Sequence, residues 1–533
     1  MNFKKYYFLV VMFFVSTQIV FTQDNGNQFS VAWQDDGQDV TAGWTISRHS
    51  FDFDNDGFGE FCAYDMVSGQ KLGFIFEAND DDSYQLMDAI PMGGGAVAIT
   101  DWNQNGLNEL TILDEAMLIF ESTGSDNEIP FDPNVIWEGL PKKGVFGGTS
   151  QGAPAVFDAD GDGELEIVCN YARNAYHIPM YNSFYLSIFS FNGDFDNPGG
   201  KIEFTNEFGI ECCGFDWGDI DNDGRIDIVT AVNQTPQLRV FTSFEKDSFE
   251  LKWEWKKPES VLLEMAETYT PMVVDINQDG QTEIIYCDTH GLVYVISGDL
   301  SQQISEDNFH YLGRFQPIGP GRNIADMRST NPGGSLGDQD ADGKPDLYWC
   351  AYHAEAVYDL EYESGSILDS TSYNWYRIWE NTTDVPFGAT MLCLGADMDQ
   401  DKKREIVMIQ RESNLDPPAI IVLESEHETS AVLADNLQSS EINYILNQNY
   451  PNPFNASTKI AYTLLENGYT ELKIYNQLGQ EVKSIVNGYQ PAGNYVYNWH
   501  GLDFKGNVVP TGLYIYSFRF GDVIVKKKMI FLK

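Results

Sequence analysis

The sequence predicts an all-β protein with a large repetitive domain and a small β-sandwich after it. Three observations predict this class. First, a nine-residue acidic pattern recurs seven times at a nearly constant spacing. Second, the copies are followed by short runs rich in β-branched and aromatic residues, which favour strands over helices. Third, the pattern stops after Glu426, and the balance of charges changes sign in the C-terminal part.

Composition restricts the possible partners of the chain. It has 533 residues and a formal net charge of −48, from 80 acidic and 32 basic residues. Nucleic acid is excluded as a partner, because phosphate binding requires a basic surface. Hydrophobic residues make up 43 % of the chain, which is enough for a large buried core. Length and repetition together indicate one large repeat domain with a small domain appended.

Residues 1–22 are predicted to be a secretory signal peptide. Lys4 and Lys5 precede an apolar stretch over about residues 6–20, and cleavage is expected before Gln23. An uncleaved N-terminal anchor is the alternative. No later apolar run approaches the ~20 residues that cross a bilayer, so we expect no transmembrane segment after cleavage.

The acidic pattern divides the chain into seven units. Successive copies begin 49, 57, 61, 56, 63 and 59 residues apart, which is typical of a solenoid or a propeller. The copies are DFDNDGFGE from Asp52, DWNQNGLNE from Asp101, DADGDGELE from Asp158, DIDNDGRID from Asp219, DINQDGQTE from Asp275, DQDADGKPD from Asp338 and DMDQDKKRE from Asp397.

Each unit contains four strand-like runs. A small-residue segment precedes the acidic loop, and three runs follow it, as in IDIVTAV, QLRVFTS and LKWEWKK. Seven such units predict a seven-bladed β-propeller, because radial repetition protects the sheet edges. The seventh unit lacks a fourth run after residues 419–425, and we expect SVAWQDD at residues 30–36 to supply it. This exchange closes a ring over residues 23–426, and an open solenoid would not need it.

The acidic loops are suited to a hard cation. Side chains at positions 1, 3 and 5, a backbone carbonyl at position 7 and a carboxylate at position 9 offer oxygen ligands. Glycine at position 6 of six copies permits the positive φ that turns these ligands inward. Flexible oxygen coordination favours several Ca²⁺ ions, up to seven, over magnesium or a transition metal. The predicted ligands are Asp52, Asp54, Asp56, Glu60, Asp101, Asn103, Asn105, Glu109, Asp158, Asp160, Asp162, Glu166, Asp219, Asp221, Asp223, Asp227, Asp275, Asn277, Asp279, Glu283, Asp338, Asp340, Asp342, Asp346, Asp397, Asp399, Asp401 and Glu405.

Two other interpretations of the loops compete with this one. An EF-hand begins in the same way, but it needs flanking helices and a glutamate at position 12. A metal-free aspartate-rich turn is disfavoured by seven copies in phase, since charges this close repel one another. We expect the second loop, with only two carboxylates, to bind an ion most weakly. Occupancy of the seventh loop is in question because Lys402 replaces the glycine.

The repeats resemble the FG-GAP/VCBS repeats of integrin-α-like β-propellers over about residues 30–435. The resemblance rests on the DxDxDGxxD/E motif, followed each time by a strand-like run. It implies a seven-bladed ring with calcium in the loops that join the first two strands of the blades. It implies no single activity, because one fold can carry many functions.

The C-terminal part is predicted to be a separate domain at residues 445–533, after a polar linker at residues 427–444. It has nine Lys and Arg residues against five Asp and Glu, a net charge of +4. Period-two runs such as TELKIYN and GLYIYSFRF, with Gly and Pro turns between them, predict a small Ig-like β-sandwich.

This domain is similar to the type A sorting domain of type IX secretion cargo. The matching segments are QNYPNPFNASTKIAYTL (448–464), LKIYNQLGQEV (472–482), AGNYVYNWHGLD (492–503) and PTGLYIYSFRFGDVIVKKKMIFLK (510–533). The resemblance implies that the domain binds the type IX secretion machinery after export through the inner membrane. It places the protein outside the cell, or on the outer-membrane surface of a bacterium with that system. An ordinary accessory sandwich is the alternative.

The end of the ring opposite the acidic loops is the expected ligand face. If the acidic loops join the first and second strands at one end of the ring, the opposite end carries two other kinds of connection. These are the loops from second to third strands and the loops from the fourth strand of one unit to the first strand of the next. The longest is YARNAYHIPMYNSFY (171–185), whose aromatic and polar side chains suit a sugar or a protein partner. Packing of the loops themselves is the plainer explanation of such residues. The candidates are Arg173, Tyr176, His177, Tyr181, Gln234, His290, Arg322, Arg328 and His353.

The function predicted from these features is a secreted or cell-surface calcium-binding module for glycan or protein. The sequence contains no HExxH motif, and the loop carboxylates are expected to be metal ligands, so no catalytic residue is assigned. An extracellular polysaccharide-active enzyme, a lyase or hydrolase, is the alternative. A structural surface protein without a small ligand is a third possibility.

Overall fold

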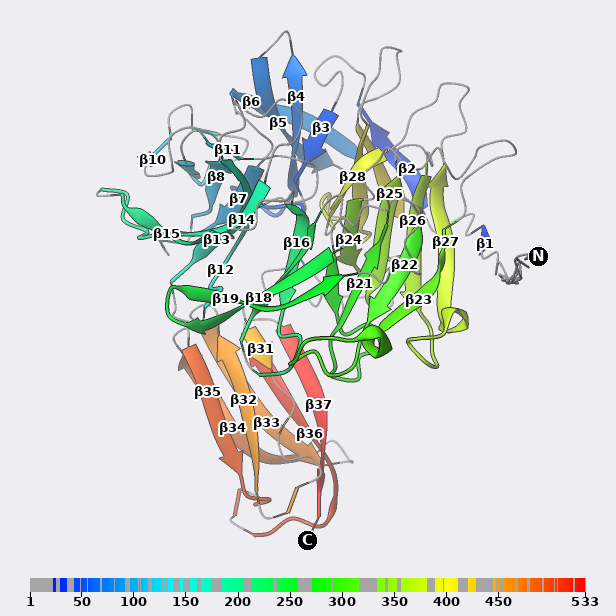
Figure 1. Cartoon of the computed structure of the whole chain (residues 1–533). Helices are drawn as coiled ribbons and strands as arrows, with labels where there is room; N and C mark the ends of the chain where they lie inside the picture. Colours follow the sequence, from blue (N-terminus) through cyan, green and yellow to red (C-terminus); the bar gives the residue numbers. More distant parts are fainter. Residues whose placement is uncertain are drawn as a thin grey trace, which may run out of the picture.

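The computed structural model describes residues 23–532 with gaps. Outside the described part lie residues 1–22, the connections 257–270, 316–332, 381–388, 411–419 and 428–443, and shorter loop segments. The described residues form a nearly all-β structure (Figure 1), in which two 3-10 helices, η2 (Glu306–Asn308) and η5 (Ser370–Ser372), precede strands. The predicted all-β class is confirmed. The predicted signal peptide and most of the predicted linker lie outside the described residues.

Seven small sheets follow one another along the N-terminal part of the chain. The first sheet contains β3 (Gly43–Ile46), β4 (Glu60–Val67), β5 (Gln70–Asp80) and β6 (Ser83–Pro91), and the second contains β7 (Ala96–Thr100), β8 (Glu109–Leu113), β9 (Met117–Glu121) and β10 (Val135–Trp137). The third sheet contains β11 (Gly144–Phe146), β12 (Ala155–Phe157), β13 (Glu166–Arg173), β14 (Phe184–Phe191) and β15 (Gly200–Thr205). The fourth sheet contains β16 (Cys212–Gly218), β17 (Asp227–Val232), β18 (Gln237–Glu245) and β19 (Ser248–Lys256). The fifth sheet contains β20 (Met272–Val274), β21 (Glu283–Cys287), β22 (Leu292–Ile296) and β23 (Phe309–Arg314). The sixth sheet contains β24 (Gly333–Gly337), β25 (Asp346–Ala351), β26 (Ala356–Tyr362), β27 (Tyr373–Glu380) and the short β1 (Gln23–Asp24). The seventh sheet contains β28 (Ala389–Leu394), β29 (Glu405–Gln410), β30 (Ile420–Ser425) and β2 (Phe29–Gln34).

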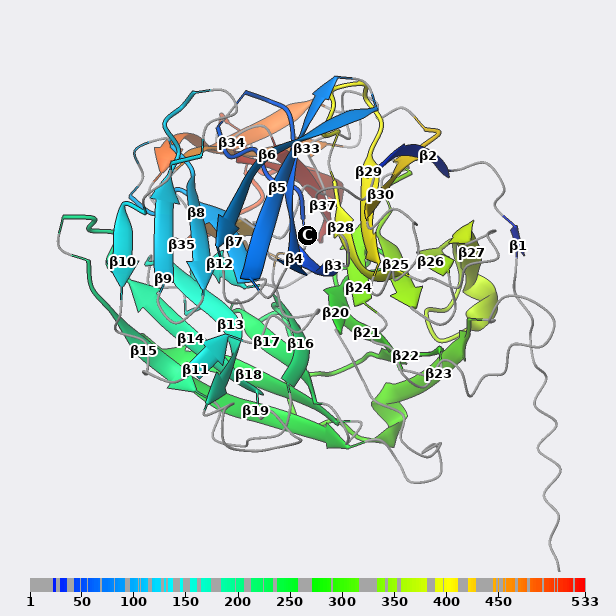
Figure 2. The ribbon, with the colours of Figure 1, turned by 90° about the horizontal axis from the view of Figure 1, so that it is seen from above.

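Buried apolar clusters join each of these sheets to the next. Ile75 of the first sheet shares a cluster with Leu110 of the second, and later sheets are joined in the same way. The series does not stop at the seventh sheet, because Phe61 of the first sheet shares a cluster with Val407 and Val422 of the seventh. Figure 2 shows the sheets succeeding one another around a common centre. Each sheet therefore buries apolar residues on both faces, as its near-continuous apolar runs require.

The N-terminal strand β2 belongs to the seventh sheet. It pairs antiparallel with β30, with Phe29 opposite Ser425 and Gln34 opposite Ile421. Trp33 of β2 also packs against Phe76 and Tyr84 of the first sheet, with ring centroids 6.0 and 5.5 Å apart. The prediction that the N-terminal run supplies the missing strand of the seventh unit is confirmed. The parallel pairing of β1 with β27 was not expected from the sequence.

The third sheet departs from the predicted four strands. Its edge beside β13 is occupied by two short strands, with β12 opposite Glu166–Val168 and β11 opposite Tyr171–Arg173. The chain between them reads GGTSQGAP at residues 147–154. Residues 147–153 lie outside the described residues, and Pro154, just before β12, cannot donate to a strand pairing.

The C-terminal part forms two further sheets around one core. Their strands are β31 (Tyr444–Leu446), β32 (Thr458–Leu464) and β35 (Gly493–Trp499), and β34 (Glu481–Gln490), β33 (Gly468–Asn476), β36 (Gly512–Phe520) and β37 (Val523–Phe531). Tyr462, Trp499 and Tyr516 are among the buried residues that fill the space between them. The predicted small β-sandwich is confirmed, and its core is separate from those of the seven sheets.

Candidate metal centres

Seven acidic segments join the first and second strands of the seven sheets. We number them loop 1 to loop 7: residues 52–60, 101–109, 158–166, 219–227, 275–283, 338–346 and 397–405. In every loop, position 9 is the first residue of the second strand. The backbone of the sheet therefore carries this carboxylate under the loop, and in loops 1, 3 and 7 the side chains at positions 1 and 3 lie beside it.

The carboxylate at position 9 is buried in all seven loops, with at most 1 % of each residue exposed. In five loops, one of its oxygens accepts a hydrogen bond from the backbone N–H of position 2, which fixes the orientation of the side chain. These bonds run from Phe53 to Glu60 (2.9 Å), Trp102 to Glu109 (2.5 Å), Ala159 to Glu166 (2.7 Å), Ile276 to Glu283 (3.2 Å) and Met398 to Glu405 (2.8 Å).

The second oxygen of this carboxylate has no hydrogen-bond partner in several loops. It is buried and unpaired in Glu60, Glu109, Glu166 and Glu405, and so is Oδ1 of Asp346. Leaving such a group buried without a partner costs roughly 1–3 kcal/mol, and more when it is charged. A divalent cation in the loop would supply the missing partner and neutralise the charge. These residues therefore fit a hard cation with oxygen ligands.

Burial raises the pKa of these carboxyl groups in the absence of a cation. The pKa of Glu60 is raised to about 9, that of Glu109 and of Glu283 to about 8, and that of Glu166 to about 10. The pKa values of Asp346 and Glu405 are raised well above the ordinary value, again chiefly by burial. A carboxylate that stays ionised here near neutral pH needs a positive charge beside it.

Backbone hydrogen bonds turn the other ligand candidates toward the interior of the loop. The position-1 carboxylate accepts from the N–H of position 5, as in Asp219 with Asp223 (3.0 Å) and Asp275 with Asp279 (2.9 Å). The position-5 side chain accepts from the N–H of position 7, as in Asp56 with Phe58 (2.7 Å). These bonds hold the side chains at the spacing that a shared ion would require.

Lys402 does not prevent loop 7 from closing in the same way. Gly57 and Gly280 at position 6 have φ of +94° and +90°, and Lys402 adopts +76° at that position. Loop 7 thus keeps the turn although its lysine is strained there. Asp397, Asp399, Asp401 and Glu405 each place an oxygen within 4.8 Å of the others, so all four predicted ligands are brought together.

Other predicted ligands are also brought together where they are described. Asp52, Asp54 and Glu60 in loop 1, and Asp158, Asp160 and Glu166 in loop 3, form groups of three whose oxygens also lie within 4.8 Å of one another. In loop 4, by contrast, Asp221, Asp223 and Asp227 contact basic side chains of the chain itself. Asp162 and Asp342 lie outside the described residues.

A further set of acidic residues faces the loops from the third strands and was missed in the sequence. In four sheets an acid lies directly opposite position 9, and like charges opposed in this way destabilise a sheet unless a cation lies between them. The pairs are Glu60 with Glu77, Glu109 with Glu121, Asp346 with Glu361 and Glu405 with Glu424.

In loops 1 and 2 the third-strand acids extend the ligand set. In loops 6 and 7 they pair instead with lysines at position 7, Glu361 with Lys344 and Glu424 with Lys403. Glu77 forms a group within 4.8 Å with Asp54 and Asp56, and Glu121 Oε1 accepts from Asn103 (2.8 Å) and Asn105 (2.6 Å). The signal was present in the sequence, since the third apolar runs end in an acid, as in FIFE and LIFE. Loop 2 therefore has one more carboxylate than its own segment provides.

The predicted ligand face lies almost entirely outside the described residues. Arg173 is the last residue of β13, at the end of the strand away from loop 3. Tyr176, His177, Tyr181, Gln234, His290, Arg322, Arg328 and His353 fall in segments that are not described.

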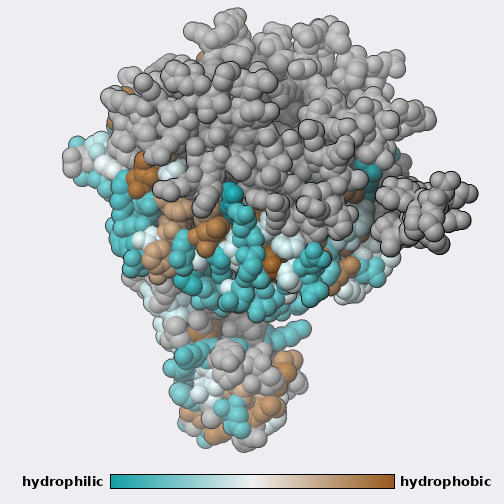
Figure 3. All heavy atoms as spheres, in the orientation of Figure 1, coloured by the Kyte–Doolittle hydropathy of each residue, from teal (hydrophilic) through white to brown (hydrophobic). Residues whose placement is uncertain are grey.

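The β-sandwich lies at the end of the seven sheets that carries the acidic loops. Burial lowers the pKa of Lys527 on β37, while the charges of Asp275 in loop 5 and Asp219 in loop 4 act in the opposite direction. Figure 1 shows the sandwich below the sheets, with β31 and β37 toward them. On the face seen in Figure 3, the described surface beside the sandwich is mostly hydrophilic.

One family model matches part of the chain. Residues 454–519 match the FlgD Ig-like domain, so the C-terminal sandwich is Ig-like. This match covers none of the acidic loops. No curated protein matches the sequence. In the described residues, no helix has the length and apolar character needed to cross a membrane.

Several solved structures resemble the chain weakly. A crystal structure of BBS1N in complex with ARL6DN has 11 % identity and a TM-score of 0.45, covering 75 % of this chain and 97 % of that one. A structure of S. cerevisiae Dbp5 bound to Nup159 and Gle1 has 9 % identity and a TM-score of 0.39, covering 76 % and 96 %. PorZ, a surface component of the type IX secretion system of Porphyromonas gingivalis, has 9 % identity and a TM-score of 0.25, covering 92 % and 81 %. At TM-scores below 0.5, these likenesses carry no conclusion about this chain.

Without calcium, the melting temperature is expected to fall as pH rises from about 5 to about 9. The raised pKa values mean that the folded state binds more protons than the unfolded state, whose carboxyl groups titrate near 4.5. Stability is therefore present below the unfolded pKa and is lost as pH rises through the folded pKa. Thermal melts in a calcium chelator at several pH values measure this dependence.

The matched control is the same series of melts in millimolar calcium. The ion favours the ionised carboxylates, so the fall between pH 5 and 9 should become smaller or reverse. A chelated chain that is more stable at pH 9 than at pH 5.5 would contradict the assignment of these buried carboxylates.

Proposed function

We propose that the chain is an exported surface protein whose calcium-stabilised, seven-bladed β-propeller binds a glycan or a protein. In this proposal the C-terminal domain directs the chain through type IX secretion. The observation that supports the calcium sites best is the unpaired buried oxygen at position 9 of several loops. It recurs at the same place in successive sheets, as expected of a repeated site rather than of one local irregularity.

Two features support the ring. Apolar clusters join consecutive sheets and also join the seventh to the first, as in the cluster of Phe61 with Val407. The exchange of β2 into the seventh sheet ties the N-terminus of this region to its end. A propeller closed by such an exchange leaves no apolar sheet face uncovered between its first and last blades.

The chemistry of the bound ion would be structural. Residues at positions 1, 3, 5 and 9 would hold Ca²⁺, joined in loops 1 and 2 by Glu77 and Glu121. When bound, the ion supplies two positive charges among carboxylates that otherwise repel one another. The carboxylates already hold backbone N–H groups of the loop, so the ion would fix the connection between the first two strands of each blade.

The binding role is proposed for the end of the ring opposite the acidic loops. Position 9 starts each second strand at the loop end, so the second-to-third connections lie at the other end. This end is away from the sandwich, which lies beside loops 4 and 5. A ligand there would remain accessible while the C-terminal domain engages its own partner. The enzyme alternative rests on side chains outside the described residues, and no described feature favours it.

A glycan array tests the binding role. We expect the purified chain to bind one class of polysaccharide in millimolar calcium and to bind it less in chelator, because the loops order the blades. Alanine variants of Tyr176, His177 and Tyr181 should reduce binding while the melting temperature stays unchanged. Normal binding by all three variants would remove this face as the site. Absence of binding to every glycan would leave a protein partner, tested by capture on intact cell surfaces.

A further inference from the structure

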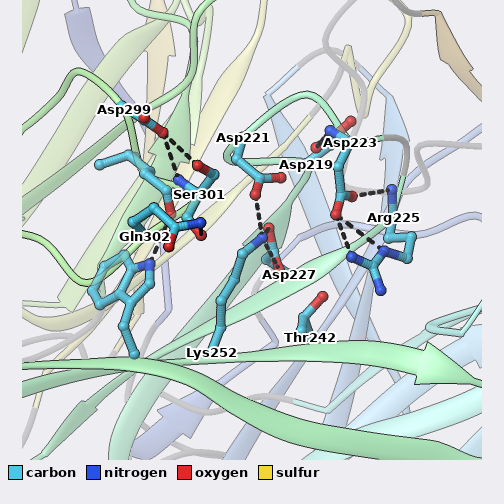
Figure 4. A network of polar contacts seen from close by, with 12 residues as sticks. Asp219, Asp221, Asp223, Arg225, Asp227, Thr242, Lys252, Asp299, Ser301 and Gln302 are labelled. Carbon is cyan, nitrogen blue, oxygen red and sulfur yellow. Dashed lines mark hydrogen bonds and ion pairs between the residues drawn. The ribbon is translucent and has the colours of Figure 1, made fainter.

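Lys252 occupies the interior of loop 4. Its Nζ lies 2.6 Å from Asp221 Oδ2 at position 3, and 3.0 and 3.1 Å from the two oxygens of Asp227 at position 9. Figure 4 shows the ammonium between the two carboxylates. The three side chains are 10 %, 5 % and 0 % exposed. The contact is therefore a buried, charge-assisted arrangement rather than a surface ion pair.

The carboxylates that Lys252 contacts correspond to ligands in other loops. Positions 3 and 9 belong to the acidic groups of loops 1, 3 and 7. In those loops the position-9 glutamate keeps a buried oxygen without a partner, as Glu60 and Glu405 do. In loop 4, both oxygens of Asp227 accept from Lys252. Asp221 Oδ1 is the oxygen of this pair that has no hydrogen-bond partner.

A second basic side chain pairs with position 5 of the same loop. Arg225 donates from Nε (3.0 Å) and Nη2 to Asp223 Oδ2, and its Nη1 donates to the Ser243 carbonyl at 2.8 Å. Three of the four predicted ligands of loop 4 are therefore paired with cations of the chain (Figure 4). The two basic side chains offset half of the four negative charges of loop 4, and both oxygens of Asp227 are already engaged.

A β-bulge explains how Lys252 reaches the loop. In the pairing of β18 with β19, Val240 lies opposite Trp253 and Phe241 opposite Leu251, so Lys252 is the extra residue. A bulge re-aims the side chain of its extra residue. The third sheet has the same bulge, and Glu203 is its extra residue. Glu203 forms an acidic group with Asp160 and Asp247, so the same backbone position carries opposite charges in the two sheets.

We infer that the Lys252 ammonium takes the place of the metal ion in loop 4. Loop 4 therefore keeps its folded conformation without binding calcium. This inference rests on the proposed calcium sites of the other loops. A divalent ion in loop 4 would meet an ammonium already held between the position-3 and position-9 carboxylates, and the two cations would repel each other. Loop 3 is the opposite case, because the bulge there carries the acid Glu203, while the half-exposed Lys201 pairs with Asp247 at the outer side of this group.

The test counts calcium ions per purified full chain by native mass spectrometry over a calcium titration. Lys252→Met keeps an unbranched side chain of similar length but removes the charge, and it should bind one ion more than the wild type. Lys252→Arg keeps the charge and should leave the count unchanged. Asp227→Asn in the wild-type background should also leave the number of bound calcium ions unchanged, because loop 4 holds none. This variant keeps the test valid if Lys252→Met does not fold.

The third sheet provides a matched variant. Glu203→Lys places an ammonium at the equivalent bulge and should reduce the wild-type count by one. Thermal melts add an independent measurement, because the melting temperature of Lys252→Met should respond to calcium more than that of the wild type. A Glu203→Lys chain with the full wild-type count would contradict the inference.

The outcomes separate this inference from the proposed function. An unchanged count in Lys252→Met, or a loss of one ion in Asp227→Asn, overturns the role of Lys252 while the other calcium sites stand. A wild type that binds no calcium overturns the calcium part of the proposed function. In that case a single ion gained by Lys252→Met still supports the inference, and none gained overturns both.

Discussion

Excess chelator is expected to lower the melting temperature of the chain by about 10 °C or more. An ion present at 100 times its dissociation constant stabilises a folded protein by about 2.7 kcal/mol per site, and the chain offers several sites. Divided by the large unfolding entropy of a domain of this size, their sum corresponds to a shift on the order of 10 °C. Melts in millimolar calcium and in chelator measure it directly.

Two controls make this prediction specific. Returning calcium to the chelated chain should restore the melt, whereas magnesium should restore little, because it demands a tighter octahedral geometry. Metal analysis of the untreated chain should find calcium. An unchanged melting temperature together with no bound metal would contradict the proposed calcium sites. The buried carboxylates would then have to be protonated in the folded chain.

Deleting residues 445–533 is expected to leave the remaining protein in the periplasm. The deleted segment contains the Ig-like sandwich and the motifs similar to a type IX sorting domain, while the predicted signal peptide is kept. Export would then stop after the inner membrane. Cell fractionation and surface labelling in a bacterium with type IX secretion, with the full chain as reference, measure the loss of surface protein.

The deletion should not unfold the seven sheets. The sandwich core around Tyr462 and Trp499 is separate from the clusters that join those sheets. Removal does expose loops 4 and 5, where Lys527 lies near Asp219 and Asp275, so a small change in stability is expected. Normal surface display of a truncated chain with an intact melt would refute the sorting role.

Much of the architecture could be predicted because repetition makes weak local signals add up. Four apolar runs in one unit are ambiguous, but seven units in phase predicted the strands and the loops between them. The predicted contribution of β2 to the seventh sheet came from a missing run at one end and a surplus run at the other, and the β2–β30 pairing confirms it.

The parts that could not be predicted depend on side-chain direction and on neighbours distant in sequence. Lys252 lies 25 residues after Asp227, and only the bulge in β19 turns it into loop 4. Glu77 and Glu121 were readable as acids at the ends of third runs, but their positions opposite Glu60 and Glu109 follow from strand register. The sequence placed the occupancy of loop 7 in question because Lys402 replaces the glycine that usually adopts a positive φ. In the structure Lys402 adopts a positive φ, and loop 7 keeps the same turn.

Anomalous scattering from crystals grown in millimolar calcium tests the central claim most directly. The account predicts peaks inside the acidic loops, between the carboxylates of positions 1, 3 and 9 in loops 1, 3 and 7, where those groups already lie within 4.8 Å of one another. It predicts no peak beside Lys252 in loop 4. Well-ordered crystals without a peak in any of the seven loops would contradict it.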